Sequence, residues 1–422
     1  MSGMLSALAW APRGAARPVP KDRGPAASPE PGRADDDDGA HSSDEEAGAE
    51  RLFGPSDAVV APGEDPYRDG DGASGSEDSD EAMDLLARED DRVLLTVRNE
   101  EELHSLNVWV YEQEGAADGA GGNVFVSREV PLAAFPLAVE WLDFALDGGP
   151  VGHLCAVSTT NPEIEIFDLD FHEALEPDLT LGGEGAADGH TAAVLGLAWN
   201  REHRHLLASA SADRTVKLWD LVAGKEVLSF GHHKGKVQCV AFNPTAPSVV
   251  LSGGFDRQVV ACDLRDPRAK PVKGKVGADV ESVAWDPAHG AGFFVAAEDG
   301  VVEKFDARVV GQDPWRLKPV WHLQAHERAA TSLALAPGAP GLLATGSVDH
   351  TAKVWDVGGP APTQLAVNDF KAGAIFACSF CPDSPFLLAV GGAGGEAILW
   401  DTATEPAVTE AFRKEKKRRR GG

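Results

Sequence analysis

Short stretches of alternating apolar and polar residues recur along most of the chain, and the stretch from His205 to Leu221 shows the pattern most clearly. Leu206 to Ser211 is small and apolar, Asp213 and Arg214 are turn formers, and Thr215 to Leu221 alternates between apolar and polar side chains. This pattern predicts a β-hairpin. Because a hairpin this short cannot bury its own apolar faces, we expect it to pack against further units like itself.

Five other predicted strands end as this hairpin does, in a bulky residue followed by aspartate. The six aspartates follow one another at intervals of 43 to 52 residues. A period of about 40–45 residues with Trp-Asp endings is characteristic of the WD40 propeller blade. The six endings are Phe167-Asp168, Trp219-Asp220, Cys262-Asp263, Phe305-Asp306, Trp355-Asp356 and Trp400-Asp401.

A second repeated feature, an apolar run, stands ahead of each hairpin and predicts an innermost strand that is buried on both faces. Ser6 to Pro12 has the same sequence pattern. We therefore expect residues 1–12 to supply the innermost strand of a first blade whose remaining strands begin near residue 92. A targeting peptide is the alternative, because basic residues follow this apolar run, but the acidic run that starts at Asp35 fits such a peptide poorly.

The repeats from residue 92 onward predict an all-β fold, a seven-bladed WD40 β-propeller. Asp91 to Glu112 and Asn123 to Val130 would complete the first blade, and Pro136 to Leu169 would form the second. Five more blades would follow and end near Phe412. We expect a propeller over residues 92–412, a disordered acidic insertion over 13–91 after the first strand, and a basic tail over 413–422.

The insertion is acidic and lacks periodic apolar positions, as disordered segments do. It holds 23 acidic and 8 basic residues, within a chain whose formal net charge is −29. It is either a solvated spacer or a docking segment for histones or other basic partners. Four serines precede acidic residues and are candidate phosphorylation sites that would deepen the charge: Ser42, Ser43, Ser74 and Ser76.

The tail is the opposite in charge and predicts nuclear or nucleolar targeting, with a solvated helix end as the alternative. Because the rest of the chain is acidic, we expect RNA to be bound only indirectly or through this tail. Its five consecutive basic residues are Lys416, Lys417, Arg418, Arg419 and Arg420.

Two blades contain side chains that together suit a buried hydrogen-bond network, in which an indole N–H donates to a hydroxyl and a neutral histidine links that hydroxyl to a carboxylate. Such residues also occur in Ser/His/Asp catalytic sites. Their recurrence from blade to blade favours a structural role, since an enzyme needs one positioned site. The sets are His190, Ser209 or Ser211, Asp213 and Trp219 in one blade, and His326, Thr345, Asp349 and Trp355 in another.

The remaining candidates for chemistry are cysteines and charged strand ends. Cys378 and Cys381 have the spacing of a metal-binding pair, but residues three apart on a strand point to opposite faces, which favours a buried pair without zinc. Asp263 with Arg265 and Asp306 with Arg308 predict salt bridges at strand ends. They also resemble the Asp-x-Arg element by which some WD40 proteins dock onto cullin-RING ligase adaptors.

Beyond the repeats, the chain resembles the periodic tryptophan protein 1 family of WD40 proteins. The resemblance rests on Ala-Trp near the N-terminus, the long acidic insert, Leu106 to Tyr111, Ala134 to Phe144, and the paired Cys-Asp-Leu-Arg-Asp-Pro and Phe-Asp-Ala-Arg strand ends. Phe135 to Phe144 is its most specific part. The chain departs from the repeat at Phe167, Cys262 and Phe305, where tryptophan is replaced.

The resemblance implies a nucleolar, non-enzymatic scaffold in ribosome biogenesis that acts in large-subunit assembly and ribosomal RNA production, with links to chromatin at ribosomal genes. It implies ribosomal proteins or pre-ribosome assembly factors as partners, and we expect a monomer within a larger complex. A substrate receptor of a cullin-RING ubiquitin ligase is the alternative. No cluster of acids or bases is confined to one blade, and no apolar run is long enough to cross a membrane, so we expect no enzyme, no cofactor and no membrane partner.

Overall fold

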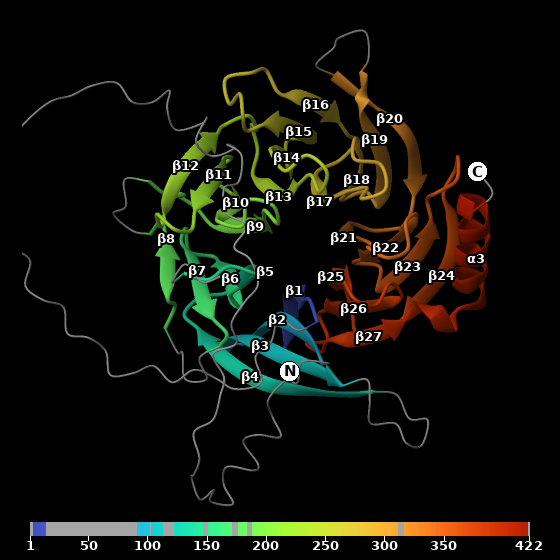
Figure 1. The fold of residues 1–422 in the computed structure, drawn as a ribbon, viewed down its shortest axis with the longest axis horizontal. Coiled ribbons are helices and arrows are strands. Elements are labelled where there is room, and N and C mark those ends of the chain that lie inside the picture. The colour runs from blue at the N-terminus through green and yellow to red at the C-terminus, as the bar shows by residue number, and fades with distance from the viewer. Residues whose placement is uncertain are drawn as a thin grey trace, which may run out of the picture.

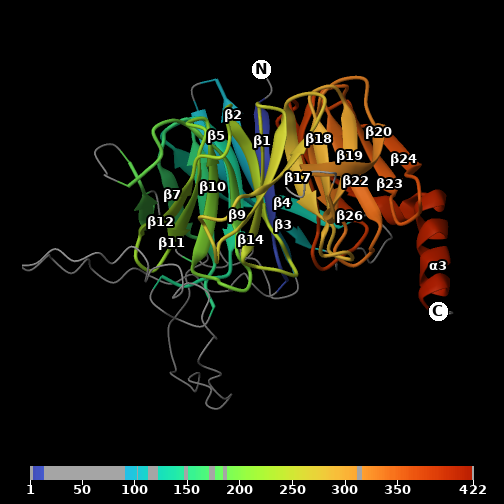
Figure 2. The ribbon, with the colours of Figure 1, turned by 90° about the horizontal axis from the view of Figure 1, so that it is seen from above.

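The computed structural model describes residues 3–13, 91–101, 103–112, 122–146, 151–170, 176–183, 188–310 and 316–420. The predicted insertion lies outside these residues except at its two ends, and so do Ser42, Ser43, Ser74 and Ser76. The described strands form small antiparallel sheets arranged as a ring around a central axis (Figure 1), and the ring is about one strand length thick (Figure 2). The all-β propeller predicted from the repeats is confirmed.

The first three blades, numbered in chain order, have four strands each, and each innermost strand faces the axis. Blade 1 contains β1 (Met4–Ala11), β2 (Arg92–Glu100), β3 (Leu103–Glu112) and β4 (Asn123–Leu132). Blade 2 contains β5 (Pro136–Leu142), β6 (Leu154–Thr159), β7 (Ile164–Asp168) and β8 (Leu179–Leu181). Blade 3 contains β9 (Val194–Trp199), β10 (Leu206–Ser211), β11 (Val216–Asp220) and β12 (Lys225–Phe230).

Blades 4 and 5 are joined into one sheet by a short parallel pairing of their outer strands, β16 and β20. Blade 4 contains β13 (Val237–Phe242), β14 (Val249–Gly254), β15 (Gln258–Asp263) and β16 (Val272–Lys275), and blade 5 contains β17 (Val280–Trp285), β18 (Gly292–Ala297), β19 (Val301–Val310) and β20 (Arg316–Gln324). Blade 6 contains β21 (Ala330–Leu335), β22 (Leu342–Ser347), β23 (Thr351–Asp356) and β24 (Thr363–Asp369). Blade 7 has three described strands, β25 (Ile375–Phe380), β26 (Leu387–Gly392) and β27 (Ile398–Asp401).

The ring is closed by β1, which pairs with β2 of its own blade and lies between the innermost strands of blades 2 and 7. Its side chains bond to both neighbours. Ser6 Oγ donates to the carbonyl oxygen of Pro136 at 2.7 Å, and Trp10 Nε1 donates to that of Ser379 at 3.0 Å. Leu5 and Ala11 have no exposed surface. The strand therefore supplies core to three blades at once.

In blades 3 to 7 the turn of the central hairpin has one residue in the left-handed backbone region, which disfavours side chains with a Cβ by about 1–2 kcal/mol. Blades 5 and 7 use glycine there, but blades 3, 4 and 6 do not. An aspartate one residue earlier offsets the strain: Asp213 Oδ1 accepts a hydrogen bond from the backbone N–H of Thr215 at 2.8 Å. The five residues are Arg214 (φ 74°), Arg257 (59°), Gly300 (78°), His350 (74°) and Gly395 (76°).

The end of the chain differs from the expected propeller boundary at residue 412. Helix α3 (Pro406–Arg420) spans it and lies outside blade 6 (Figure 2). Val408 is fully buried, and the Phe412 ring meets Phe386 of blade 7 edge-on at 5.0 Å. Proline is favoured at a first helical position, and residues four apart share one helix face, so these residues dock a helix rather than a strand. No helix among the described residues has the length and apolar character needed to span a membrane.

Deleting residues 1–12 should open the ring, whereas deleting residues 20–85 should leave it closed. The first deletion removes a core strand, and truncating a buried tryptophan alone costs about 3–5 kcal/mol. The second only shortens a connection, whose closure entropy grows with the logarithm of its length. Thermal unfolding of the two truncated proteins compares them directly. Equal melting temperatures would contradict the assignment of β1 as the closing strand.

Candidate functional site

The four side chains singled out in blade 3 form one buried network. Trp219 Nε1 donates to Ser209 Oγ at 2.8 Å, Ser209 Oγ lies 2.7 Å from His190 Nε2, and His190 Nδ1 lies 2.8 Å from Asp213 Oδ2. A carboxylate only accepts, so Nδ1 carries the proton and Nε2 accepts from the hydroxyl. Burial raises the pKa of Asp213, but hydrogen bonds from His190 and Thr215 more than offset this and hold it well below its usual value. Ser211, the alternative hydroxyl, donates instead to backbone carbonyls of residues 192 and 193.

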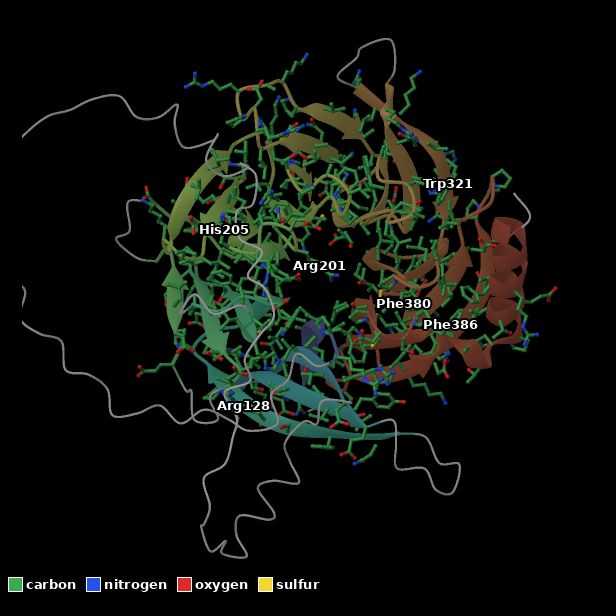
Figure 3. The ribbon with its side chains drawn as sticks, viewed as in Figure 1. Arg128, Arg201, His205, Trp321, Phe380 and Phe386 are labelled. Atoms are coloured by element: carbon green, nitrogen blue, oxygen red, sulfur yellow. The ribbon has the colours of Figure 1, made fainter. Side chains whose placement is uncertain are left out.

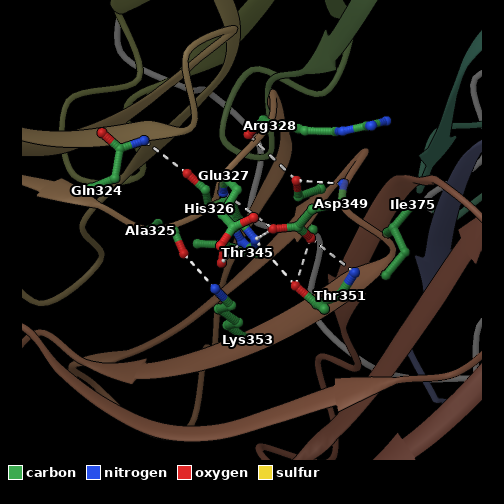
Figure 4. Close-up of polar contacts among 12 residues, drawn as sticks. Gln324, Ala325, His326, Glu327, Arg328, Thr345, Asp349, Thr351, Lys353 and Ile375 are labelled. Atoms are coloured by element: carbon green, nitrogen blue, oxygen red, sulfur yellow. Dashed lines mark hydrogen bonds and ion pairs between the residues drawn. The ribbon is translucent and has the colours of Figure 1, made fainter.

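Blade 6 repeats this arrangement with threonine in place of serine (Figure 4). Trp355 Nε1 donates to Thr345 Oγ1 at 3.0 Å, His326 Nε2 lies 2.7 Å from the same oxygen, and His326 Nδ1 lies 2.9 Å from Asp349 Oδ2. Burial lowers the pKa of His326 against the opposing effect of Asp349, so the imidazole is held neutral. The side chains of His190 and His326 have no exposed surface. A substrate therefore has no access to either histidine, and both networks tie strands together.

The strand register shows that an indole faces a hydroxyl in three blades and that both are replaced in two others, whereas blade 7 keeps Trp400 with Val390 in place of the hydroxyl. In blades 1, 3 and 6 a tryptophan stands at the end of the third strand, and a hydroxyl stands two residues further along the second strand than the tryptophan's partner. In blade 1 this pair is Trp109 and Thr96, with Nε1 2.8 Å from Oγ1. In blades 2 and 5, phenylalanine replaces tryptophan, and Val157 and Val295 replace the hydroxyl. No buried hydroxyl in these two blades loses its donor as a result.

Blade 4 contains a network that the sequence analysis missed. His233 Nδ1 lies 3.0 Å from Asp256 Oδ1, and His233 Nε2 lies 2.8 Å from Ser252 Oγ. The fourth position, however, is Cys262, which has no indole N–H to offer. The signal was present in Gly231-His232-His233, which stands at the place of the Gly-His pair in blade 3.

The two Asp-x-Arg strand ends have the same geometry on neighbouring blades. In each, the guanidinium turns back onto its own aspartate, with Nη2 to Oδ2 distances of 2.7 Å for Arg265–Asp263 and for Arg308–Asp306. The arginine side chains remain 65% and 73% exposed. Each hydrogen bond to its arginine lowers the pKa of the aspartate. Exposed pairs of this kind contribute little to stability, so their rigid geometry is available to a partner.

The two cysteines with metal-pair spacing lie in different clusters. Cys378 packs between blades 6 and 7 with its Sγ 3.2 Å from Ser332 Oγ, whereas Cys381 packs with Trp10 of blade 1. Burial raises the pKa of Cys378 to about 11, which keeps this thiol protonated at neutral pH. No group of three metal-ligating side chains occurs among the described residues.

Two carboxyl groups on innermost strands, Glu140 of β5 and Glu281 of β17, have raised pKa values. The side chain of Arg201 reaches into the central opening (Figure 3). Burial raises the pKa of Glu140 to about 7, against the opposing charge of Arg201. Burial and the neighbouring charges of Glu298 and Asp279 raise the pKa of Glu281 to about 7. Both carboxyl groups are therefore protonated more readily than an exposed glutamate. The sequence gives no sign of these shifts, because they depend on burial.

The predicted targeting residues, Lys416 to Arg420, continue helix α3. Their backbone is described, but their side chains lie outside the described part of the chain. The helix carries them away from the docked residues Val408 and Phe412 toward the end marked C in Figure 2.

Replacing Trp219 by phenylalanine should destabilise the protein by roughly 1–3 kcal/mol, because Ser209 is left without its donor in the core. Trp321→Phe is the matched control: this partly exposed ring packs on Phe294, and its Nε1 makes no hydrogen bond with described residues. We expect its effect to stay within about 0.5 kcal/mol. Denaturant unfolding measures both midpoints.

The double variant Trp219→Phe with Ser209→Val copies blades 2 and 5 and tests the same network more strictly. It removes donor and acceptor together, so its loss should be smaller than the sum of the two single losses. Strictly additive losses would show that the indole and the hydroxyl are not coupled.

Comparison with known proteins places these features in a family. The WD domain, G-beta repeat model matches residues 185–220, 224–261, 317–356 and 366–401. An uncharacterized WD repeat-containing protein of Schizosaccharomyces pombe is 38% identical over 82% of this chain and 68% of its own length. The periodic tryptophan protein 1 homolog of Drosophila melanogaster is 31% identical over 75% of this chain and 68% of its own length. For periodic tryptophan protein 1 of Saccharomyces cerevisiae the values are 29%, 84% and 70%.

These relationships extend over most of the chain and well beyond the four matched repeats. They agree with the resemblance found in the Ala-Trp start, the long insert and the segment around Phe135 to Phe144. The chain belongs to the periodic tryptophan protein 1 family of WD-repeat proteins.

Proposed function

We propose that this protein is a non-enzymatic scaffold in ribosome biogenesis, acting in large-subunit assembly and ribosomal RNA production in the nucleus and nucleolus. The observation that carries the proposal is the family relationship, which spans 75–84% of the chain. The propeller rims would bind ribosomal proteins or pre-ribosome assembly factors, with the protein as a single copy in the complex.

The chemistry of the ring supports a scaffold. The histidines and hydroxyls that resemble a catalytic site are held in buried networks, whereas Arg265 and Arg308 are exposed at strand ends. A propeller joins many strands into one rigid body, and rigid partners lose little conformational freedom on binding. The structure thus presents fixed surfaces for protein contacts.

The charged segments complete the proposal. The basic cluster from Lys416 to Arg420 would direct the protein to the nucleus and nucleolus. The insertion would hold histones or other basic partners, with phosphorylation at Ser42, Ser43, Ser74 or Ser76 strengthening that attraction. Because the remaining chain is acidic, the ring would repel RNA phosphates, and protein contacts would hold it on the particle.

A second candidate function is a substrate receptor of a cullin-RING ubiquitin ligase. The observation that favours it is the identical, exposed arrangement of Asp263–Arg265 and Asp306–Arg308 on adjacent blades. Two arginines held in the same orientation would suit one adaptor surface that spans both blades. Affinity purification separates the two functions, since one predicts ribosomal assembly factors and the other a cullin with its adaptor.

Changing Lys416 to Arg420 together to alanine should move the protein toward the cytoplasm. Alanine has the highest helix propensity, so α3 should stay folded and docked through Val408 and Phe412. Fluorescence microscopy measures the distribution. When an unrelated nuclear signal is added, the variant should still sediment with pre-ribosomal particles in a gradient. If it enters the nucleus but no longer sediments with them, the tail binds RNA directly and the scaffold proposal fails.

Reversing both arginines, as Arg265→Glu with Arg308→Glu, tests the second function. Loss of a cullin and its adaptor from the purified complexes, with assembly factors retained, would support it. The fold should be unaffected, because both side chains are on the surface. If no cullin is found with the unchanged protein, the second function is rejected.

A further inference from the structure

Blade 4 is the one described blade that keeps a histidine–hydroxyl–aspartate network without an indole. Ser252 Oγ lies 2.8 Å from His233 Nε2 and 3.4 Å from the carbonyl oxygen of Val260. No N–H donates to it among the described residues, whereas Ser209 in blade 3 accepts from Trp219. In blades 2 and 5, where phenylalanine replaces tryptophan, valine also replaces the hydroxyl. Blade 4 differs because it keeps the hydroxyl, the histidine and the aspartate without the indole.

There is open space beside Cys262, where the other networks have an indole. In blade 3, a Cβ added to Gly182, which follows the outer strand of the preceding blade, would lie 3.3 Å from Trp219 Cη2. Gly231 follows the outer strand of blade 3, and a Cβ added there meets no atom within 4 Å. A cavity of about 190 Å³ lies here between blades 3 and 4. Its wall includes Phe230, His232, Cys262 and Val272.

This cavity fits one aromatic side chain. An apolar cavity of about 150 Å³ is large enough to bind benzene. The wall is mainly apolar, with Phe230 on one side and Ala261 and Val272 on the other. It is bordered by the loop that follows β15, and this loop also carries Arg265. An aromatic side chain inserted in the cavity would thus lie near the exposed side chain of Arg265.

The surroundings of the cavity are basic, although the chain is acidic. Leu264 to Lys275 contains five basic residues and one acidic residue. Arg268 and Lys270 are exposed, and Lys270 lines the cavity together with Asp263 and Asp266. Asp263, at the start of the loop, is held by Arg265 at 2.7 Å. A peptide that brings acidic residues on either side of an aromatic ring would match both the apolar cavity and its charged border.

We propose that the cavity beside Cys262, bounded by blades 3 and 4, is a docking site for an acidic peptide segment of a partner protein that inserts one tryptophan side chain. The inserted ring takes the space that Trp219 and Trp355 fill in their own blades. Flanking carboxylates lie against the loop from Leu264 to Lys275. This site is independent of the proposed role in ribosome biogenesis, which stands or falls on other contacts.

Two synthetic pentapeptides test the proposal on the full-length protein. One has tryptophan flanked by two acidic residues on each side, and the other has alanine in place of tryptophan. Because a buried aromatic anchor dominates the energy of such contacts, the alanine peptide should bind at least tenfold more weakly. Binding of the tryptophan peptide should weaken as salt is added, since the flanking charges are exposed. Isothermal titration calorimetry measures both, and free indole serves as a minimal probe of the cavity.

Filling the cavity from within is the decisive variant. Cys262→Trp should abolish binding of indole and weaken the tryptophan peptide at least tenfold, whereas Cys262→Ala keeps the cavity and should bind within about threefold of the unchanged protein. A raised melting temperature for Cys262→Trp would show that the variant folds. If it does not fold, Cys262→Phe occupies less space and serves the same purpose.

Reversing two charges on the loop distinguishes the contribution of the basic residues to peptide binding from that of the apolar cavity. Arg268→Glu with Lys270→Glu should weaken the peptide about tenfold and leave indole binding unchanged. The proposal is overturned if the two peptides bind equally, if neither binds at millimolar concentration, or if folded Cys262→Trp or Cys262→Phe binds them as the unchanged protein does.

Discussion

The structure depends on closing the ring, because an open ring would expose the innermost strands of two blades. The closing strand is β1, which is joined to β2 by a connection of about 80 residues and still pairs with it from Met4 to Ala11. The entropy of so long a loop grows slowly with length, and Leu5, Trp10 and Ala11 give core contacts that offset it. The insertion can therefore change in length and composition at little expense to the fold.

Within the ring, the blades are held by two alternative kinds of core. Blades 3 and 6 use an indole, a hydroxyl, a histidine and a carboxylate, and blades 2 and 5 use phenylalanine against valine. Both solutions leave no buried donor or acceptor unmatched at this position, which is the expensive outcome. Blades 4 and 7 are mixed. Blade 7 keeps Trp400 with Val390 in place of the hydroxyl, and blade 4 keeps Ser252 with Cys262 in place of tryptophan. An open cavity lies beside Cys262.

The propeller could be predicted because the sequence pattern recurs every 43 to 52 residues and each repeat predicts one blade. Features that occur once were harder to predict. Helix α3 follows the last Trp-Asp pair without a repeat marker, and only Pro406 with the spacing of Val408 and Phe412 signals it. The network of His233 and Asp256 was missed because Cys262 stands where the other networks have their tryptophan donor. The cavity and the raised pKa of Glu140 and Glu281 arise from packing between blades, which no single segment of sequence contains.

Buried polar groups in this molecule stabilise the blades, and exposed polar groups are the ones that a binding partner can reach. The histidines that resemble members of a catalytic triad have no exposed side-chain surface. Burial raises the pKa of Asp213 less than its hydrogen bonds lower it, and burial lowers the pKa of His326. Such groups are stable because they do not exchange partners, which is the reverse of what catalysis needs. The exposed charged groups are instead at strand ends and in the loop after β15, where five of the residues from Leu264 to Lys275 are basic. Local charge of opposite sign to the whole favours an acidic partner at this part of the rim.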